Sequence, residues 1–538
     1  MANLTTNGTQ IPIEIVGASV FGRYGTISQE RTYNMFISQS GDGEEKWLVN
    51  FPGFKARVNF YEDSHEGRAI FNSTRGAFLI CVIAGSVFRL NSVTDAPTLV
   101  GTLTSASGPV FIDENLSSQI CLIDGQDVYI YNYQSNTFAI ATLTNPPGGS
   151  FDPAEFVPNY VTYHNTYFIF GNGILTNAGS QWYIFQKGVG DTELVWVQTL
   201  TLQTKPDFAK AVIRMPGKGN NILVFGETVA EIWTDVGGLD VYQRNSSVNI
   251  DYGTQAVSTI AANDEYIVWL SVNNNSSPTI MVMQGSSPMP LSTDGIDYLL
   301  GLVTVPQDST GFFYRHDGHL FYQLTFYNNA DQLSIIYDFT LQKFYNLTDW
   351  DFTHFPARKI SYFNEKTYFV SLKDGHLYEL SSNFTTYDFN ATSPLPKQIP
   401  RERITDTFRL PTPEQWIINL FTFFVDAGTS QNIGLLPACY GYILDEQYGQ
   451  PILSEDGGYL LSEAGYCELL FLRIDLSLSK NGGFTFGNEM RIDLKGTGVY
   501  RAQPRFYNLG MAHEVTFQLR FWSSDRVVIK NALMEITQ

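Results

Sequence analysis

Cysteine is scarce in this sequence, with four residues in a chain of 538 and no Cys-x-x-Cys pair among them. This usage gives no sign of a disulfide framework of the kind that holds small secreted domains together, nor of a zinc ribbon. Cys81 and Cys121 fall inside expected strands, whereas Cys439 and Cys467 flank one inserted segment. We therefore expect all four to be buried, reduced thiols.

The sequence also lacks the marks of a targeting segment or a membrane span. Its first ten residues, MANLTTNGTQ, contain neither the basic region nor the apolar region of a signal peptide. The longest apolar run near the front, residues 77–84, is too short to cross a bilayer. We expect a protein that is made in the cytoplasm and is not secreted.

Positive charge is in short supply. The chain has 33 Lys and Arg against 53 Asp and Glu, which gives a net charge of −20. A protein with this balance does not grip a phosphate backbone through its overall field. It is suited to letting a polyanion slide past.

Enzymatic signatures are missing as well. There is no GxSxG, Walker loop, GxGxxG or HExxH, and we predict no catalytic residue, cofactor or metal site. His316 and His319 form an HxxH, but they flank an Asp-Gly turn, which favours a hairpin over a metal site. Residues 479–486, SKNGGFTF, resemble the Asp-box of sialidase-type propellers, a device that stabilises a turn.

The chain is rich in aromatic residues, at 14%, and in short runs that alternate apolar and polar residues. Residues 359–389 show the pattern best, with four runs separated by polar turns that include Asp374-Gly375. Alternation with a period of two predicts half-buried strands, and Asp-Gly suits a tight hairpin turn. This unit therefore predicts a four-stranded antiparallel meander, which must stack on other layers to bury both faces.

The same unit recurs along the chain. Copies begin near residues 69, 109, 160, 209, 257, 311 and 359, and their mean spacing resembles the roughly 40 to 50 residues of four-stranded propeller blades. We predict an all-β protein with a seven-bladed β-propeller, with six or eight blades as the alternatives. A long array of β-sandwiches would need less even spacing.

The composition changes divide the chain into four segments. Residues 1–68 form an N-terminal arm that we expect to pack with the C-terminal domain, residues 69–392 form the propeller, and residues 393–411 form a Pro- and Arg-rich connector. Residues 412–538 predict a C-terminal β-sandwich. Arg401, Arg403 and Arg409 in the connector are candidate partner contacts, and the competing interpretation is a solvated edge strand.

An acidic insertion at about residues 437–467 repeats a short strand followed by an acidic glycine turn. Glu455, Asp456 and Glu463 lie in these turns and are candidate partner contacts. The insertion has two interpretations that we weigh evenly: a projecting hairpin stack that docks a partner, or a cover for an exposed sheet edge. The ligand spacing of an EF-hand is absent.

Two groups of motifs resemble a known family. The first is the Arg-Thr-x-Asn phrase with Arg31 and Asn34, followed by the Phe-Pro-Gly turn with Pro52 and Gly53. The second is the order of strands and glycine turns near the C-terminus, which includes Gly498 and Gly510. Together with the repeats, these motifs resemble the tail hub proteins of short-tailed, P22-like bacteriophages, also described as packaged-DNA stabilisation proteins.

The resemblance implies a structural protein of the virion tail. It implies a homo-hexameric ring below the adaptor and portal rings, with tailspikes or tail fibres outside and a plug or needle below. It also implies that double-stranded DNA passes through the channel without sequence-specific binding. The alternative function is a carbohydrate-binding or glycan-cleaving propeller, which aromatic-rich repeats also permit.

Overall fold

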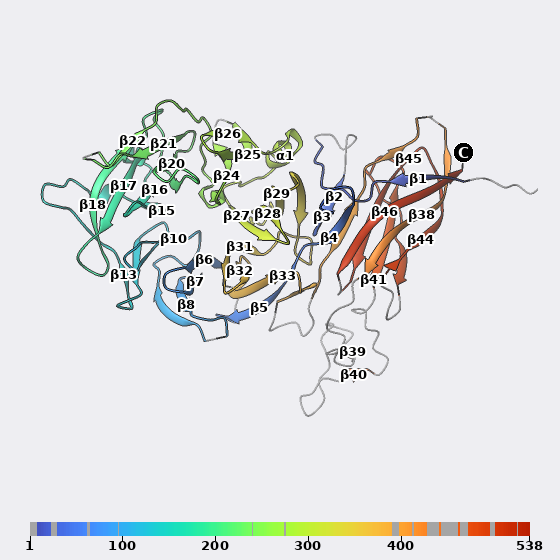
Figure 1. The fold of residues 1–538 in the computed structure, drawn as a ribbon, viewed down its shortest axis with the longest axis horizontal. Helices are drawn as coiled ribbons and strands as arrows, with labels where there is room; N and C mark the ends of the chain where they lie inside the picture. The colour runs from blue at the N-terminus through green and yellow to red at the C-terminus, as the bar shows by residue number, and fades with distance from the viewer. Residues whose placement is uncertain are drawn as a thin grey trace, which may run out of the picture.

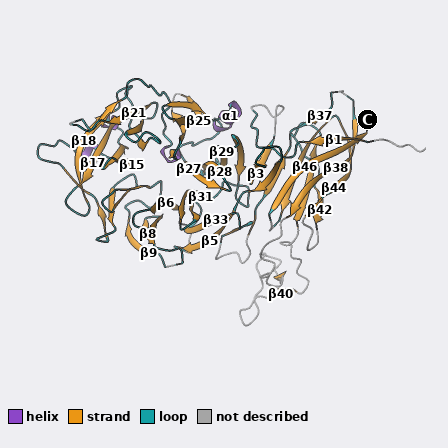
Figure 2. Cartoon of the chain, in the orientation of Figure 1, coloured by secondary structure: helices purple, strands orange, loops and turns teal. Residues whose placement is uncertain are grey.

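The computed structural model describes residues 8–22, 30–61, 65–94, 96–238, 240–273, 276–389, 397–411, 414–427, 441–442, 461–462, 472–494, 501–523 and 526–537. Strands dominate this part of the chain (Figure 2). Its helices are the α-helix α1 (Asp294–Leu300) and the 3-10 helices η1 (Pro153–Glu155), η2 (Asn177–Ser180) and η3 (Val257–Thr259). Among the described residues, no helix is long and apolar enough to cross a membrane.

Six blades of a β-propeller are built from strands that follow one another along the chain (Figure 1). The first strand of a blade packs against the first strand of the next around much of the ring, so these strands face the propeller axis. The blades are β6 (Gly67–Ser73), β7 (Phe78–Ile83), β8 (Ser86–Leu90) and β9 (Thr98–Thr102); β10 (Phe111–Glu114), β11 (Gln119–Ile123), β12 (Val128–Asn132) and β13 (Thr137–Ile140); β15 (Pro158–His164), β16 (Tyr167–Asn172), β17 (Gln181–Lys187) and β18 (Glu193–Thr201), with β14 (Thr142–Thr144) parallel to β18; β19 (Ala211–Arg214), β20 (Asn221–Phe225), β21 (Ala230–Asp235) and β22 (Tyr242–Arg244); β23 (Ala261–Ala262), β24 (Tyr266–Asn273), β25 (Ser276–Gln284) and β26 (Ser287–Pro290); and β27 (Ser309–His316), β28 (His319–Phe326), β29 (Leu333–Asp338) and β30 (Lys343–Leu347).

One further four-stranded sheet closes the ring, and its strands come from both ends of the propeller sequence. β31 (Ala357–Phe363), β32 (Lys366–Ser371) and β33 (His376–Ser381) are completed by β5 (Gly53–Asn59), which pairs antiparallel with β33. β31 then packs against β6 of the first blade. The predicted all-β propeller is confirmed, but residues 384–389 are not the fourth strand of this unit, because β34 (Thr386–Asp388) lies outside β5 and pairs parallel with it.

The middle strands of the blades explain why the repeats are apolar. All six side chains of β7 and all five of β11 are buried, because each blade packs between two neighbours. Burial of both faces favours continuous apolar runs over alternation. Cys81 and Cys121 belong to these strands as free, buried thiols, which confirms the prediction for these two; Cys439 and Cys467 lie outside the described residues.

The C-terminal region contains two sheets that pack face to face. Phe421 of one sheet stacks on Phe517 of the other at 4.0 Å between ring centroids, and Phe423 meets Phe521 edge to face. The first sheet contains β1 (Thr9–Ile13), β3 (Met35–Gln39), β4 (Lys46–Asn50), β38 (Trp416–Ala427), β43 (Arg501–Ala502), β44 (Arg505–Ala512) and β46 (Val527–Thr537). The second contains β2 (Arg31–Tyr33), β36 (Arg401–Ile404), β41 (Leu472–Ser479), β42 (Met490–Leu494) and β45 (Glu514–Trp522), with β37 (Phe408–Arg409) paired to β45.

The second of these sheets continues into the propeller. β2 pairs parallel with β30, the last strand of a blade, and antiparallel with β36, which pairs in turn with β45. Hydrogen-bonded strands therefore run without a break from β27 to β42. The segment predicted as an extended connector supplies the central strand β36 of this joint, and β35 (Lys397–Gln398) before it pairs with β34.

The acidic insertion is described only at residues 441–442 and 461–462. β39 (Gly441–Tyr442) and β40 (Leu461–Ser462) pair antiparallel, with Gly441 opposite Ser462. Glu455, Asp456 and Glu463 lie outside the described residues, as does Gly498.

Candidate functional site: the polar joint between the propeller and the C-terminal sheets

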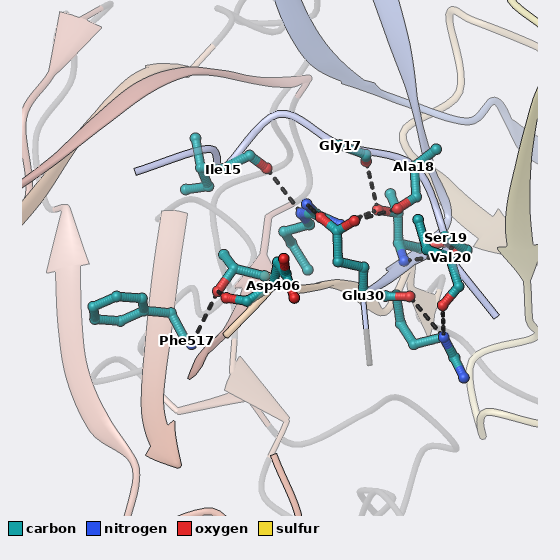
Figure 3. A network of polar contacts seen from close by, with 12 residues as sticks. Ile15, Gly17, Ala18, Ser19, Val20, Glu30, Asp406 and Phe517 are labelled. Atoms are coloured by element: carbon teal, nitrogen blue, oxygen red, sulfur yellow. Dashed lines mark hydrogen bonds and ion pairs between the residues drawn. The ribbon is translucent and has the colours of Figure 1, made fainter. Parts of the chain in front are cut away.

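Arg403 is the centre of a buried polar network where the N-terminal arm crosses β36. Figure 3 labels its partners Ile15, Ala18 and Glu30. Its guanidinium donates to the backbone carbonyls of Ile15 and Ala18, at 2.9 and 3.1 Å. It also donates to the Oγ1 atom of Thr32 and forms an ion pair with the carboxylate of Glu30. Burial lowers the pKa of Arg403, but the neighbouring Glu30 carboxylate opposes this shift. A buried charge held by this many acceptors fixes the path of the arm.

Ser19 and Thr32 extend the network towards the propeller. The Ser19 hydroxyl donates to the side-chain oxygen of Asn346 on β30 at 2.8 Å and accepts from the backbone N–H of Thr32 at 2.9 Å. The Thr32 hydroxyl donates to the carbonyl of Gly17. Ser19 also forms a backbone bridge with Phe344 of β30. The arm is thus bonded to a blade through both side chains and backbone.

Asn34 joins three segments that are far apart in the sequence. Its side-chain amide donates to the hydroxyl of Thr348 at 2.8 Å and to the carbonyl of Pro400 at 2.7 Å, and its side-chain oxygen accepts from the backbone N–H of Thr348. Its φ of +54° is in the left-handed region, which Asn tolerates better than most residues. These two properties explain the asparagine of the Arg-Thr-x-Asn phrase.

The other early motif residues also have structural roles. The Arg31 guanidinium donates to the carbonyls of Val20 and Glu30 and lies over the ring of Phe21. Pro52 is buried, and Gly53 opens β5. A Cβ atom on Gly53 would lie 2.3 Å from the carbonyl oxygen of Thr386, so only glycine lets β5 approach this backbone.

The arginines of the predicted connector separate into two groups. Arg401 and Arg403 are buried, so they are not accessible to a partner, and β36 is a central strand instead of a solvated edge. Arg401 donates to the carbonyls of Ser523 and Thr385. Glu402 pairs with Arg520 at 2.6 Å, and not with the neighbouring arginines.

Arg409 is the exposed member of the set and pairs with Glu514. It lies beside the 479–486 turn, because its guanidinium is within 4 Å of where a Cβ atom on Gly482 would be. The turn is built as the Asp-box resemblance predicts, since the Asn481 side chain accepts from the Thr485 backbone N–H. Gly510, at a φ of +85°, lies opposite this turn beside the amine of Lys480.

The two histidines of the HxxH are parts of the aromatic core. His319 pairs with the carboxylate of Asp338 at 2.7 Å and packs edge to face on Phe36. Burial lowers the pKa of His316. In the described part of the chain, no three His, Cys, Asp or Glu side chains gather in a group that could hold a metal ion.

The propeller carries a cavity of about 380 Å³ at the ends of its inner strands. Glu66, Asp308, Tyr327 and Arg358 are among its lining residues. Arg358 pairs with Glu66 at 2.9 Å and lies over the ring of Tyr327. Close by, Lys359 donates to the carbonyls of two other blades, and burial lowers the pKa of its amine to about 7. These contacts link neighbouring blades.

The closed ring, the N-terminal strand that completes it and the fused C-terminal sheets define a β-propeller protein with an attached pair of packed sheets. The family model described as "Bacteriophage P22 Gp10, beta-propeller" matches residues 9–384, more than half of the chain. The chain therefore belongs to this family of structural phage proteins, and the resemblance to the tail hub proteins of P22-like phages is confirmed. No curated protein sequence matches the chain.

The solved structures that match this chain do so at low sequence identity and low TM-score. One is PorZ, an essential bacterial surface component of the type-IX secretion system of Porphyromonas gingivalis, with 10% identity, a TM-score of 0.36 and coverage of 66% of this chain. This chain spans 44% of the PorZ chain. Another is U3-55K, with 8% identity, a TM-score of 0.37 and coverage of 61% of this chain and 99% of that chain.

Four residues of the joint were missed by sequence reasoning: Ser19, Glu30, Asn346 and Thr348. Single polar residues in turns and strand ends carry no periodic signal, and each of these four residues has a partner more than 300 residues away. The Arg-Thr-x-Asn phrase was the available clue, because a fixed polar phrase between apolar strands indicates buried hydrogen bonds.

Proposed function

We propose that this chain is the subunit of a phage tail hub, a ring that extends the channel below the portal and adaptor rings. Six copies surround the channel, and the ring helps to close the head and retain the packaged DNA. The outer surface docks tailspikes or fibres, and the lower opening docks a plug or needle. The family match over residues 9–384 carries the proposal.

The charge distribution supports passage of DNA without gripping. Residues 53–389 contain 17 Lys and Arg against 32 Asp and Glu, so the propeller segment alone carries −15 of the net charge of −20. A channel wall with this negative charge repels the phosphate backbone of DNA instead of binding it. Retention of DNA then depends on steric closure by the ring and its plug.

The joint supports a role as a rigid spacer. The propeller and the C-terminal sheets are connected by paired strands and by the buried Arg403 network, and not by a flexible linker. Identical subunits in a closed ring use two different faces of each copy, and a rigid subunit keeps these faces at a constant angle.

The test is assembly on the portal. The purified chain is mixed with the portal and adaptor complex of its source particle, and the mass of the product is measured by native mass spectrometry. We expect one discrete product with six added copies. Omission of the adaptor is the control, and it should reduce the added mass to zero. A chain that stays monomeric in the complete mixture and binds glycans on a panel would contradict the proposal and favour a carbohydrate-binding propeller.

A further inference from the structure

A cleft of about 440 Å³ lies on the surface of the C-terminal sheets, beside an edge strand of each sheet. We call it the open-side cleft. Its apolar wall is formed by Leu478, Phe486, Met490 and Leu509, which come from β41, the 479–486 turn, β42 and β44. Lys480 and Asn481 supply polar atoms. The cleft therefore lies between an edge of one sheet and an edge of the other.

Both strands beside the cleft are edge strands. Within the described residues, β42 pairs only with β41, and β44 pairs only with β38. Each has a row of backbone N–H and C=O groups on its outer side that an additional strand can pair with. Sheet edges beside an apolar cleft are the setting in which proteins bind an extended segment by strand addition, with alternate side chains seated in the cleft.

The charge at the cleft selects the kind of segment. Lys480 is exposed and has no ion pair with any residue that the structure describes. Arg409 lies beside Gly482 of the same turn and pairs with Glu514, while Arg520 pairs with both Glu489 and Glu402. Lys480 is thus the charged side chain among the residues that line the cleft, and its charge is positive. An acidic segment with apolar side chains is the complementary ligand.

The chain itself contains such a segment. Residues 443–466 have five acidic residues, no Lys or Arg, and short apolar runs separated by glycine turns. Residues 443–460 are bounded by a two-stranded ladder in which Gly441 lies opposite Ser462. The apolar runs suit addition to an edge strand, and the acidic turns suit Lys480.

The attachment point favours a second copy as the source. The insertion follows the end of β38 and precedes the start of β41, whereas the open-side cleft is at the end of β41, roughly 20 Å away along the strand. The strand ends that flank the insertion and the strand ends that flank the cleft are thus on opposite sides of the sheets, and a closed ring requires two unlike faces on each subunit.

We propose that the open-side cleft receives the acidic insertion, residues 443–466, of a neighbouring copy of this chain by strand addition. The inference rests on the ring of the proposed function, and it names the contact between neighbours. The 437–467 segment is then a docking element and not an edge cover for its own subunit.

Photo-cross-linking with isotope labels tests this contact. The residue p-benzoyl-phenylalanine replaces Asn488, which lines the cleft. Light and heavy copies of the full chain are mixed and irradiated, both as concentrated purified protein and after assembly on the portal and adaptor complex. We expect cross-links that join a light chain to residues 443–466 of a heavy chain. Cross-links only within one chain, to another virion protein, or to no residue in either sample would overturn the inference.

A charge-reversal set gives the second readout. Lys480→Glu should reduce the mixed cross-link yield at least about fivefold, since it places like charges together. Glu455→Lys in the other copy should restore most of the yield. Lys218→Glu changes an exposed lysine of the propeller that has no ion pair among the described residues, so it is the matched control and should leave the yield unchanged. Equal effects of Lys480→Glu and Lys218→Glu would contradict the contact.

The two proposals fail in different ways. Mixed cross-links in purified protein without any added mass on the portal would contradict the tail hub assembly while supporting the cleft. Six added copies without mixed cross-links would support the hub and overturn the cleft contact.

Discussion

At the scale of residues, buried polar side chains determine how the N-terminal arm is placed. Arg403 and Asn34 each bond to backbone carbonyls from segments that no local sequence pattern connects. Removing one partner from a buried ion pair leaves an uncompensated charge, and this costs more than the pair contributes. These positions should therefore be sensitive to substitution.

Arg403→Met is expected to lower the free energy of unfolding by about 3 to 5 kcal/mol, because Glu30 and two carbonyls lose their buried donor. Urea denaturation followed by circular dichroism gives the measurement. Arg409→Met is the matched control, and removal of this exposed ion pair should cost no more than about 1 kcal/mol. Similar losses for the two variants would contradict the role of Arg403.

Asn34 allows backbone and side-chain effects to be separated. Asn34→Gly and Asn34→Ala both lose the hydrogen bonds to Thr348 and Pro400. The alanine must also adopt a φ of +54°, so Asn34→Ala should be less stable than Asn34→Gly by about 1 to 2 kcal/mol. Denaturation midpoints of the two variants, compared under the same conditions, measure this difference. An alanine variant as stable as the glycine variant would contradict the backbone account.

At the scale of elements, the sequence predicts the strands far better than their partners. The seven predicted repeat starts lie within about four residues of the first strands of the sheets, because the apolar runs and Asp-Gly turns are local signals. The closing strand β5 was assigned to the arm, since its alternation resembles that of any other strand and its partner β33 is about 320 residues away. Arg401 and Arg403 were misread for the same reason. Their charge suggested exposure, and only long-range pairing shows that β36 is central.

Gly53→Val should open the composite sheet locally. Its Cβ atom would meet the carbonyl oxygens of Phe384 and Thr386, which are backbone atoms and cannot move aside cheaply. Hydrogen exchange measured by mass spectrometry should show loss of protection in β5 and β33, with β20 and β21 unchanged. Gly41→Val is the control, because nothing lies within 4 Å of its Cβ position. Uniform loss of protection across all blades would show that β5 is not a separate closing element.

The loop between β30 and β31 predicts a dependence on pH. Burial, together with the charge of Lys373, lowers the pKa of His354 to about 4, while Asp351 opposes the shift. The unfolded chain binds this proton near pH 6.5 and the folded chain only near pH 4, so stability falls as the pH drops through this window. The decrease in the free energy of unfolding should approach about 3 kcal/mol near pH 4.

His354→Gln isolates that contribution. The free energies of unfolding of the wild-type chain and the variant are measured at pH 7.5 and at pH 4.5. The change between the two pH values is then compared between the two proteins. We expect the variant to lose less stability than the wild-type chain over this interval. Parallel losses in the two proteins would mean that other groups cause the pH dependence.

At the scale of the whole molecule, the propeller and the C-terminal sheets share one sheet and one large apolar core. This core contains residues of β27 and β28 as well as residues of β38 and β45. Two regions joined in this way should not unfold independently, because separation would expose the shared core to water.

A single cooperative transition is therefore expected on denaturation. Hydrogen exchange at increasing urea concentration can follow β28 of the propeller and β45 of the C-terminal sheets in one experiment. Both strands should lose protection at the same midpoint. Two separate midpoints in the wild-type chain would show that the shared sheet does not couple the regions, and Arg403→Met should bring the chain closer to that behaviour.

The placement of the N-terminal strands has a consequence for synthesis on the ribosome. β5 emerges early but must wait for β33, and β1 must wait for β46 at the end of the chain. At about 5 to 20 residues per second, the wait for β33 lasts roughly 15 to 70 seconds. During this time the nascent chain exposes unpaired strand edges, and a chain truncated before β46 lacks a partner for its first strand. Only a chain synthesised through β46 contains the partners of both of these strands.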